Sequence, residues 1–212
     1  MAYNFPEGSK FQFSTTFASA KTISALSNAS PAVATSTAHG YSALDEILLT
    51  SGWEDATNTI FRVAAIDANS FGVSGLNSSN TTYFGVGTGT GSAQKISGWT
   101  DIPQVLSIPN SGGDARFTTV QPLAARNGLQ IPTGFNAAST TLTLAHDPAL
   151  AAYITMLDLS RSFTKVAFRV VGAGGTSYGY GYMSVSENPQ KQSGQVDQVT
   201  CAISMIGRQI SF

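Results

Sequence analysis

The residue types that could support chemistry are two histidines, one cysteine and two adjacent pairs of carboxylates in a chain of 212 residues. Cys201 cannot form a disulfide within the chain, and His39 and His146 lack the cysteine partners of a standard zinc site. The carboxylate pairs are at residues 45–46 and 54–55. Adjacent side chains on a strand point to opposite faces, so the two members of a pair cannot act together as a general acid and a general base. We therefore expect no metal, no cofactor and solvated carboxylates in polar turns.

Two glycine-rich segments match functional motifs only in part. Residues 85–91 (GVGTGTG) fit neither the dinucleotide-binding nor the Walker spacing, and no helix is predicted after them, so a flexible turn is expected. Residues 175–179 (GTSYG) match the nucleophile elbow around Ser177, but that motif requires a histidine later in the chain. Both histidines precede Ser177, so the sequence does not favour a catalytic role for it.

The enzymatic alternative is a serine hydrolase of the chymotrypsin kind. Residues 37–39 (TAH) and 110–113 (NSGG) resemble the histidine and serine motifs of that family, and an all-β fold would suit it. Against it, Asp114 stands where the family has proline, and the interval from His39 to Ser111 is shorter than two six-stranded barrels require. We predict a protein that is not an enzyme, with a hydrolase using His39 and Ser111 as the alternative.

The low charge content favours a protein that packs against copies of itself. Charged residues make up 11% of the sequence and apolar residues 42%, so few ions have to be desolvated at each contact. A secreted β protein is the other class that this composition fits. Eleven basic and twelve acidic residues give a net charge of −1, which disfavours stable DNA binding but allows DNA to pass. The N-terminus lacks a signal-peptide pattern and no apolar run of about 18 residues exists, so we expect synthesis in the cytoplasm and no membrane span.

Alternation of apolar and polar residues predicts a mostly β protein. The clearest strand is at residues 198–205, where every second residue is apolar, and residues 164–186 are typical of a hairpin around a glycine-rich turn. Tyrosines alternate with glycines along the second strand of that hairpin, and we expect them to pack inside the protein or against a partner. The same alternation predicts further strands at residues 11–17, 141–144 and 165–171.

One α-helix is predicted at residues 148–160. Asp147 can accept hydrogen bonds from a first helical turn, and Pro148 suits the first helical position. The apolar residues at helical spacing are Leu150, Tyr153, Ile154 and Leu157. We expect this apolar stripe to cover one face of the sheet.

Residues 30–95 have a sequence pattern that differs from the rest of the chain, with strand and turn signals of their own. They predict a small β module inserted into an all-β sandwich or barrel core that is formed by residues 1–29 and 96–212. Short strands are expected inside the module at residues 45–50, 60–66 and 71–74, and core strands on either side of it at residues 21–26 and 104–108.

This order of elements resembles the major tail tube protein of long-tailed bacteriophages, over residues 1–28 and 96–212. The resemblance includes the N-terminal strand pair, the helix after Asp147 and the closing strand at residues 195–207. The segments between them that resemble the family are residues 97–105 (SGWTDIPQV), 108–113 (IPNSGG) and 130–134 (QIPTG).

The resemblance implies a structural virion protein. In that family six copies form a ring, and stacked rings form the conduit through which the genome leaves. Core sheets make the inner wall, and a long hairpin stacks the rings. It also implies a place in the virion tail, assembly in the host cytoplasm, transient passage of DNA, and contacts with tape measure, tail terminator and distal tail proteins.

Five residues are predicted to serve such an assembly. We expect Phe5 and Phe212 to anchor contacts between subunits, because both ends of the chain are expected to be loose arms in a monomer. Lys191 is expected to pair with a carboxylate of a neighbouring subunit. Asp114 and Asp197 lie in stretches with few cations and are predicted to face the lumen, where basic side chains would trap the duplex.

The module at residues 30–95 resembles a small β module of phage structural proteins that is named after a half-domain of the ubiquitin-activating enzyme. The segments that resemble it are residues 39–49 (HGYSALDEILL), 61–63, 69–71 and 75–77. Residues 30–95 contain no cysteine, so no ubiquitin chemistry is implied. The resemblance implies a module that projects from the outside of the tube.

Overall fold

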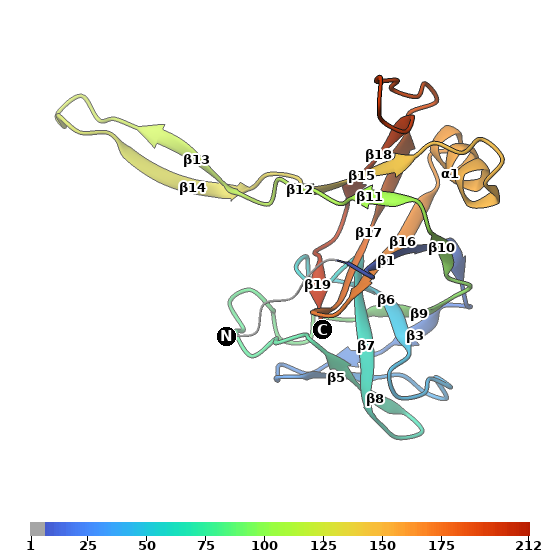
Figure 1. Ribbon diagram of the computed structural model, residues 1–212. Helices are drawn as coiled ribbons and strands as arrows, with labels where there is room; N and C mark the ends of the chain where they lie inside the picture. The colour runs from blue at the N-terminus through green and yellow to red at the C-terminus, as the bar shows by residue number, and fades with distance from the viewer. Residues whose placement is uncertain (1–6) are drawn as a thin grey trace.

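Alternating apolar and polar residues form two large antiparallel sheets in the computed structural model, which describes residues 7–212 (Figure 1). The first sheet runs in the order β10-β1-β16-β17-β18-β15-β11, with β12 paired to β15 and β19 paired to β17. Its strands are β1 (Lys10–Ser14), β10 (Thr100–Ile102), β11 (Val105–Ser107), β12 (Asn110–Ser111), β15 (Ser139–Ala145), β16 (Lys165–Gly172), β17 (Gly175–Val185), β18 (Gln198–Met205) and β19 (Ile210–Ser211). The strand predicted at residues 198–205 and the hairpin of β16 and β17 are confirmed.

The second sheet runs in the order β2-β9-β6-β7-β8-β5-β4, and β3 also pairs with β9. Residues 21–26 join its two ends, because β3 pairs with β9 and β4 pairs with β5. The sheet thus closes into what we call the barrel, around buried side chains such as Trp53, Phe61 and Phe71. Its strands are β2 (Thr16–Phe17), β3 (Lys21–Ile23), β4 (Ala25–Leu26), β5 (Ala32–Thr35), β6 (Glu46–Ser51), β7 (Thr59–Ile66), β8 (Ser70–Ser74) and β9 (Gly91–Ser97).

The all-β fold with one helix is therefore confirmed, whereas a separate module at residues 30–95 stays a prediction. Strands β5 to β8 and most of β9 lie within that range, but β2, β3 and β4 of the same barrel precede it. Residues 21–26, which were expected to be core strands, belong to the barrel. Leu48 and Ile60 of the barrel also pack against Tyr180 of the first sheet.

The helix α1 (Ala151–Arg161) covers the other face of the first sheet, where Tyr153 and Met156 join its apolar side chains. It begins three residues later than predicted, because Pro148 lies in a turn that the N–H of Leu150 closes on the carbonyl oxygen of Asp147. The predicted apolar stripe is wrong at Ile154, which is 46% exposed. The buried residues of the helix are Ala152, Tyr153 and Met156.

Strand β17 contributes to both faces of the first sheet. Tyr178 and Tyr180 are buried against the barrel, as predicted, while Tyr182 is 39% exposed. Gly179 points to the opposite face, where a Cβ atom would collide with the ring of Phe168. The alternation of tyrosine and glycine thus lets one strand carry large side chains on the barrel side and receive a large ring on the helix side.

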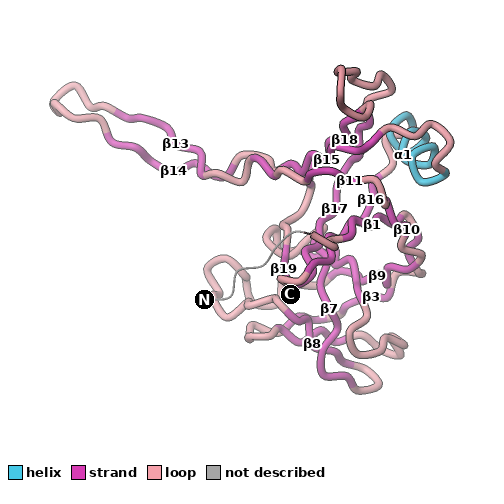
Figure 2. The backbone as a smooth tube through the Cα atoms, in the orientation of Figure 1, coloured by secondary structure: helices cyan, strands magenta, loops and turns pink. Residues whose placement is uncertain are grey.

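Strands β13 (Ala115–Val120) and β14 (Leu129–Phe135) pair with each other in a separate two-stranded sheet. We call residues 115–135 the hairpin arm, and Figure 2 shows it extending far from both large sheets. Every residue of its two strands is exposed. Alternation did not predict these strands, because neither of their faces packs on a core.

Candidate assembly surfaces

The residues predicted for chemistry do not meet in the fold. His39 is 3% exposed, its Nδ1 accepts the N–H of Tyr41 at 3.0 Å, and its Nε2 lies 2.9 Å from the carbonyl oxygen of Asp67. Ser111 lies in β12, shortly before the hairpin arm, and its Oγ is 2.9 Å from Oγ of Ser139. Backbone groups thus occupy both ring nitrogens of His39, and the pair proposed for a serine hydrolase is not brought together.

Within residues 7–212, no group of three or more histidine, cysteine, aspartate or glutamate side chains is arranged to hold a metal ion. In the same part of the chain, no helix combines the length and apolarity needed to cross a membrane. Cys201 is buried, and burial raises the pKa of its thiol to about 12. The thiol therefore stays protonated and unreactive at neutral pH.

The carboxylates of Asp45 and Glu46 each have a cationic partner in the fold. Oδ1 of Asp45 lies 2.7 Å from Nζ of Lys95, within the barrel. Oε1 of Glu46 lies 2.6 Å from Nη1 of Arg169, which belongs to the first sheet. The expectation of solvated turn charges is wrong for Glu46, whose side chain is 12% exposed, because β6 packs against the first sheet.

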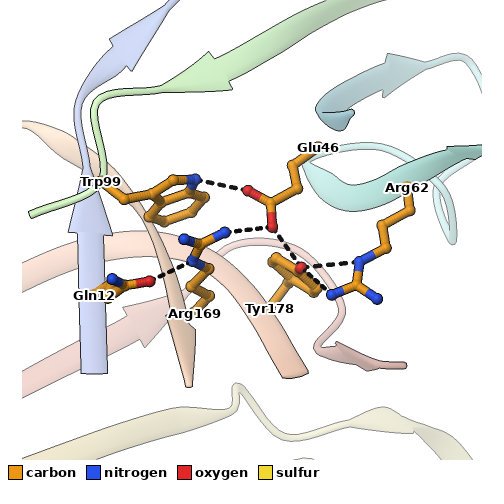
Figure 3. A network of polar contacts seen from close by, with 6 residues as sticks. All are labelled: Gln12, Glu46, Arg62, Trp99, Arg169 and Tyr178. Carbon is orange, nitrogen blue, oxygen red and sulfur yellow. Dashed lines mark hydrogen bonds and ion pairs between the residues drawn. The ribbon is translucent and has the colours of Figure 1, made fainter. Parts of the chain in front are cut away.

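Glu46 is the centre of a polar network between the two sheets, which we call the junction network (Figure 3). Its Oε2 accepts the indole N–H of Trp99 at 2.6 Å, and its Oε1 accepts the hydroxyl of Tyr178 at 2.5 Å. Arg62 donates to the Tyr178 oxygen from Nε at 3.0 Å and from Nη2 at 2.6 Å. The members of the network are Gln12, Glu46, Arg62, Trp99, Arg169 and Tyr178.

The junction network fixes how the sheets lie against each other, since Arg169 and Tyr178 come from the first sheet and Glu46 and Arg62 from the barrel. Burial, followed by the hydrogen bond to Glu46, raises the pKa of Tyr178, so its hydroxyl remains a donor at neutral pH. Sequence reasoning missed this network. The available signal was a charged residue, at positions 46 and 62, in each of two segments rich in apolar residues.

The hairpin arm presents apolar side chains that its own chain leaves exposed. Val120 is paired with Leu129, and Ile131 lies two residues further along the same strand, so these three side chains share one face. The arm contains Arg116 and Arg126 and no acidic residue. Its large exposed apolar side chains are Phe117 (54%), Val120 (43%), Leu123 (109%), Leu129 (62%), Ile131 (47%) and Phe135 (76%). An apolar surface of this kind marks a contact with another molecule.

The structure places four of the five residues predicted for assembly, and Phe5 lies outside the described residues. Phe212 is half-buried in its own chain, and its ring packs against Tyr178, because β19 pairs with β17 instead of leaving a loose arm. Lys191 Nζ lies 3.4 Å from Oδ2 of Asp197 in the same chain. Asp114 is exposed at the base of the hairpin arm. Their roles between subunits and in the lumen stay predictions.

The comparisons with known proteins cover the larger part of the chain. A family model described as phage tail tube protein, TTP, matches residues 51–211. A solved structure described as the virion of a native gene transfer agent particle is similar over 54% of this chain and 88% of its own, with 13% sequence identity and a TM-score of 0.40. The comparison with curated proteins found no match. The family match includes the first sheet from β10 onward, α1 and the whole hairpin arm.

Proposed function

This chain belongs to the phage tail tube protein family, and on that premise we propose that six copies form a ring and that rings stack into the tube. The chain is a structural protein of the virion tail. The observation that carries the stacking is the hairpin arm, which extends from the first sheet with six large apolar side chains exposed. An extended arm reaches a neighbouring ring, and burial of its side chains there supplies the free energy of association.

Contacts within a ring are proposed at the ends of the first sheet, where β10 and β11 are the terminal strands. A terminal strand leaves a row of backbone N–H and C=O groups that can pair with another strand. Pairing of this kind between neighbouring copies would continue the first sheet around the ring. The barrel then takes the place predicted for the inserted module, on the outside of the tube.

The expected result for the purified protein is spontaneous formation of six-membered rings and tubes. Negative-stain electron microscopy at high protein concentration, with and without tail components, would measure this directly. Class averages with six-fold symmetry support the proposal. Persistent monomers under all these conditions, from protein that is folded by circular dichroism, would contradict it.

The tube would serve as the conduit for genome ejection, with no catalytic role for the chain. Assembly would take place in the host cytoplasm, and the ends of the tube would contact the tail terminator, tape measure and distal tail proteins. The low positive charge supports passage of DNA without capture, since affinity for the duplex grows with each cationic contact.

We propose that Asp114 or Asp197 faces the lumen, and we predict that Asp114→Lys slows genome ejection while tubes form normally. Each added lysine provides a phosphate contact, which retards the sliding duplex and makes the delay depend on salt. Ejection from phage particles triggered in vitro at low and high salt is the measurement. Glu54→Lys, the same charge change on an exposed residue of the barrel, is the matched control. Equal delays for both variants would refute the assignment of Asp114, and a tube map with both aspartates outside the lumen would refute the whole proposal.

A further inference from the structure

Phe163 has an unfavourable backbone conformation at the end of α1. Its φ is +49°, a left-handed conformation in which glycine is the usual residue. The N–H of Thr164 donates to the carbonyl oxygen of Leu159 at 3.1 Å, and the N–H of Phe163 donates to that of Ser160 at 3.3 Å. These two bonds form the Schellman motif that ends many helices. The motif itself requires no phenyl ring at this position.

Packing within the chain does not offset the free-energy cost of this backbone conformation, because the Phe163 side chain is 78% exposed. Twenty-one glycines occur elsewhere in the sequence, ten of them at positive φ, so glycine is widely used where the backbone requires it. The exposed ring of Phe163 is therefore free to make a contact outside its own chain, and an aromatic ring buries a large apolar area when it does so.

An uncharged groove lies at the other end of β16. It has a volume of about 310 Å³, which is enough to hold an aromatic ring, and Val105, Leu106, Ile108 and Val170 form its apolar walls. Leu106 is 52% exposed, and the other three pack on the edge of the core beneath α1. Among residues 7–212, the remaining lining residues are serines, Asn110 and Gln209, so none of the described lining residues carries a charge that an entering phenyl ring would desolvate.

Phe163 cannot reach this groove in its own chain. Phe163 lies two residues before the start of β16 at Lys165, whereas Val170 is near its end. Five residues of strand at about 3.3 Å each separate Lys165 from Val170 by roughly 17 Å, which is longer than a phenylalanine side chain. An apolar group at one end of a molecule and an apolar groove at the other make a head-to-tail contact that repeats from copy to copy.

We propose that Phe163 of one copy inserts into the groove of Val105, Leu106, Ile108 and Val170 on a second copy of this chain. This contact rests on the proposed tube assembly and adds a site that is separate from the hairpin arm. It gives a role to a phenylalanine at a position where the helix end favours glycine.

The first test is Phe163→Gly, for which stability and assembly should change in opposite directions. Relief of the left-handed strain should raise Tm of the monomer by roughly 2–4 °C. Loss of the ring should raise the critical concentration for tube formation at least about tenfold. Leu44→Gly is the matched control, because Leu44 also has positive φ (+66°) and is 74% exposed, but lies in the barrel. It should raise Tm and leave assembly unchanged.

The second test locates the partner by cysteine cross-linking. A mixture of the Phe163→Cys and Leu106→Cys variants, oxidised under tube-forming conditions, should give a covalent dimer that neither variant gives alone. Cys201 need not be removed, since it is buried and protonated. Val86→Cys replaces Phe163→Cys as the control, since Val86 is 75% exposed on the barrel.

Four outcomes would overturn the contact while the wild-type protein forms tubes. They are normal assembly of Phe163→Gly, a fall in its Tm that shows packing within its own chain, equal loss of assembly in Leu44→Gly, and no cross-link above the Val86→Cys level. Failure of the wild-type protein to form tubes would overturn the proposed function, and this contact with it.

Discussion

Replacing residues 115–135 by Asn-Gly is expected to abolish tube formation and to leave the folded monomer intact. The N–H of Gly113 donates to the carbonyl oxygen of Asn136 at 3.1 Å, and the N–H of Asn136 donates to that of Asp114 at 2.9 Å. The chain is therefore already paired at the base of the arm, where a two-residue Asn-Gly turn can close it. Because no residue of 115–135 belongs to the three core clusters, Tm should change by less than about 3 °C.

Point variants separate loss of the apolar contact from loss of the arm itself. Leu129→Asp and Ile131→Asp place a charge on the shared apolar face and should each raise the critical concentration for tube formation by about 30-fold or more. Val86→Asp is the control, since it makes the same kind of change at an exposed position of the barrel. Sedimentation of tubes over a concentration series measures the effect. Normal tubes from the arm-deleted protein would refute the stacking role.

Glu46→Ala is expected to produce the largest loss of stability of any single change at a charged residue discussed above. It leaves Arg169, whose side chain is 22% exposed, without its carboxylate partner between the sheets, and it also removes the acceptor for Trp99 and Tyr178. Breaking such a pair costs about 3–5 kcal/mol. For a chain of this length that corresponds to a fall in Tm of roughly 6–20 °C, measurable by calorimetry.

Two further variants test whether the loss of stability in Glu46→Ala comes from disruption of the junction network. Glu46→Gln keeps an acceptor for Trp99 and should fall between Glu46→Ala and the wild type. Glu187→Gln removes the exposed partner of Arg161, at 2.9 Å, and should leave Tm unchanged. In a double-mutant cycle, Glu46→Ala and Arg169→Ala should be less than additive. Additive effects, or equal shifts for the Glu46 and Glu187 variants, would show that the network does not hold the sheets together.

The strands that the sequence predicted well have one face on a core. In β18 every second side chain, from Val199 to Met205, is buried, and in β15 Leu142 and Leu144 are buried in the same way. Burial of one face of a strand requires an apolar residue at every second position, so the alternation in the sequence predicts the strand. The family resemblance of the chain rested on the order of these same elements.

The features that the sequence did not reveal depend on partners far away in the chain or outside it. Glu46 reads as a turn charge until β6 is known to lie against Arg169, which is 123 residues later. The hairpin arm has no core to impose a pattern, and in the chain alone both its faces are exposed. Phe163 does not stand out by residue type, because the feature that distinguishes it is a left-handed φ in the folded chain. The sequence did not predict these features because they depend on packing between distant segments or on surfaces that nothing in the chain covers.

The pairing of β1 with β16 sets the order in which a newly made chain can fold. Gln12 and Arg169, which are hydrogen-bonded in this pairing, are 157 residues apart, whereas the barrel is complete once residue 97 has been synthesised. During translation the barrel can close early, whereas β1 cannot pair with β16 until most of the chain has been synthesised. The core beneath α1 and the groove at its edge therefore form last. If the proposed ring contacts are made by the first sheet, an unfinished chain has no completed sheet to offer a neighbour, and a subunit has to finish folding before it adds to a growing tube.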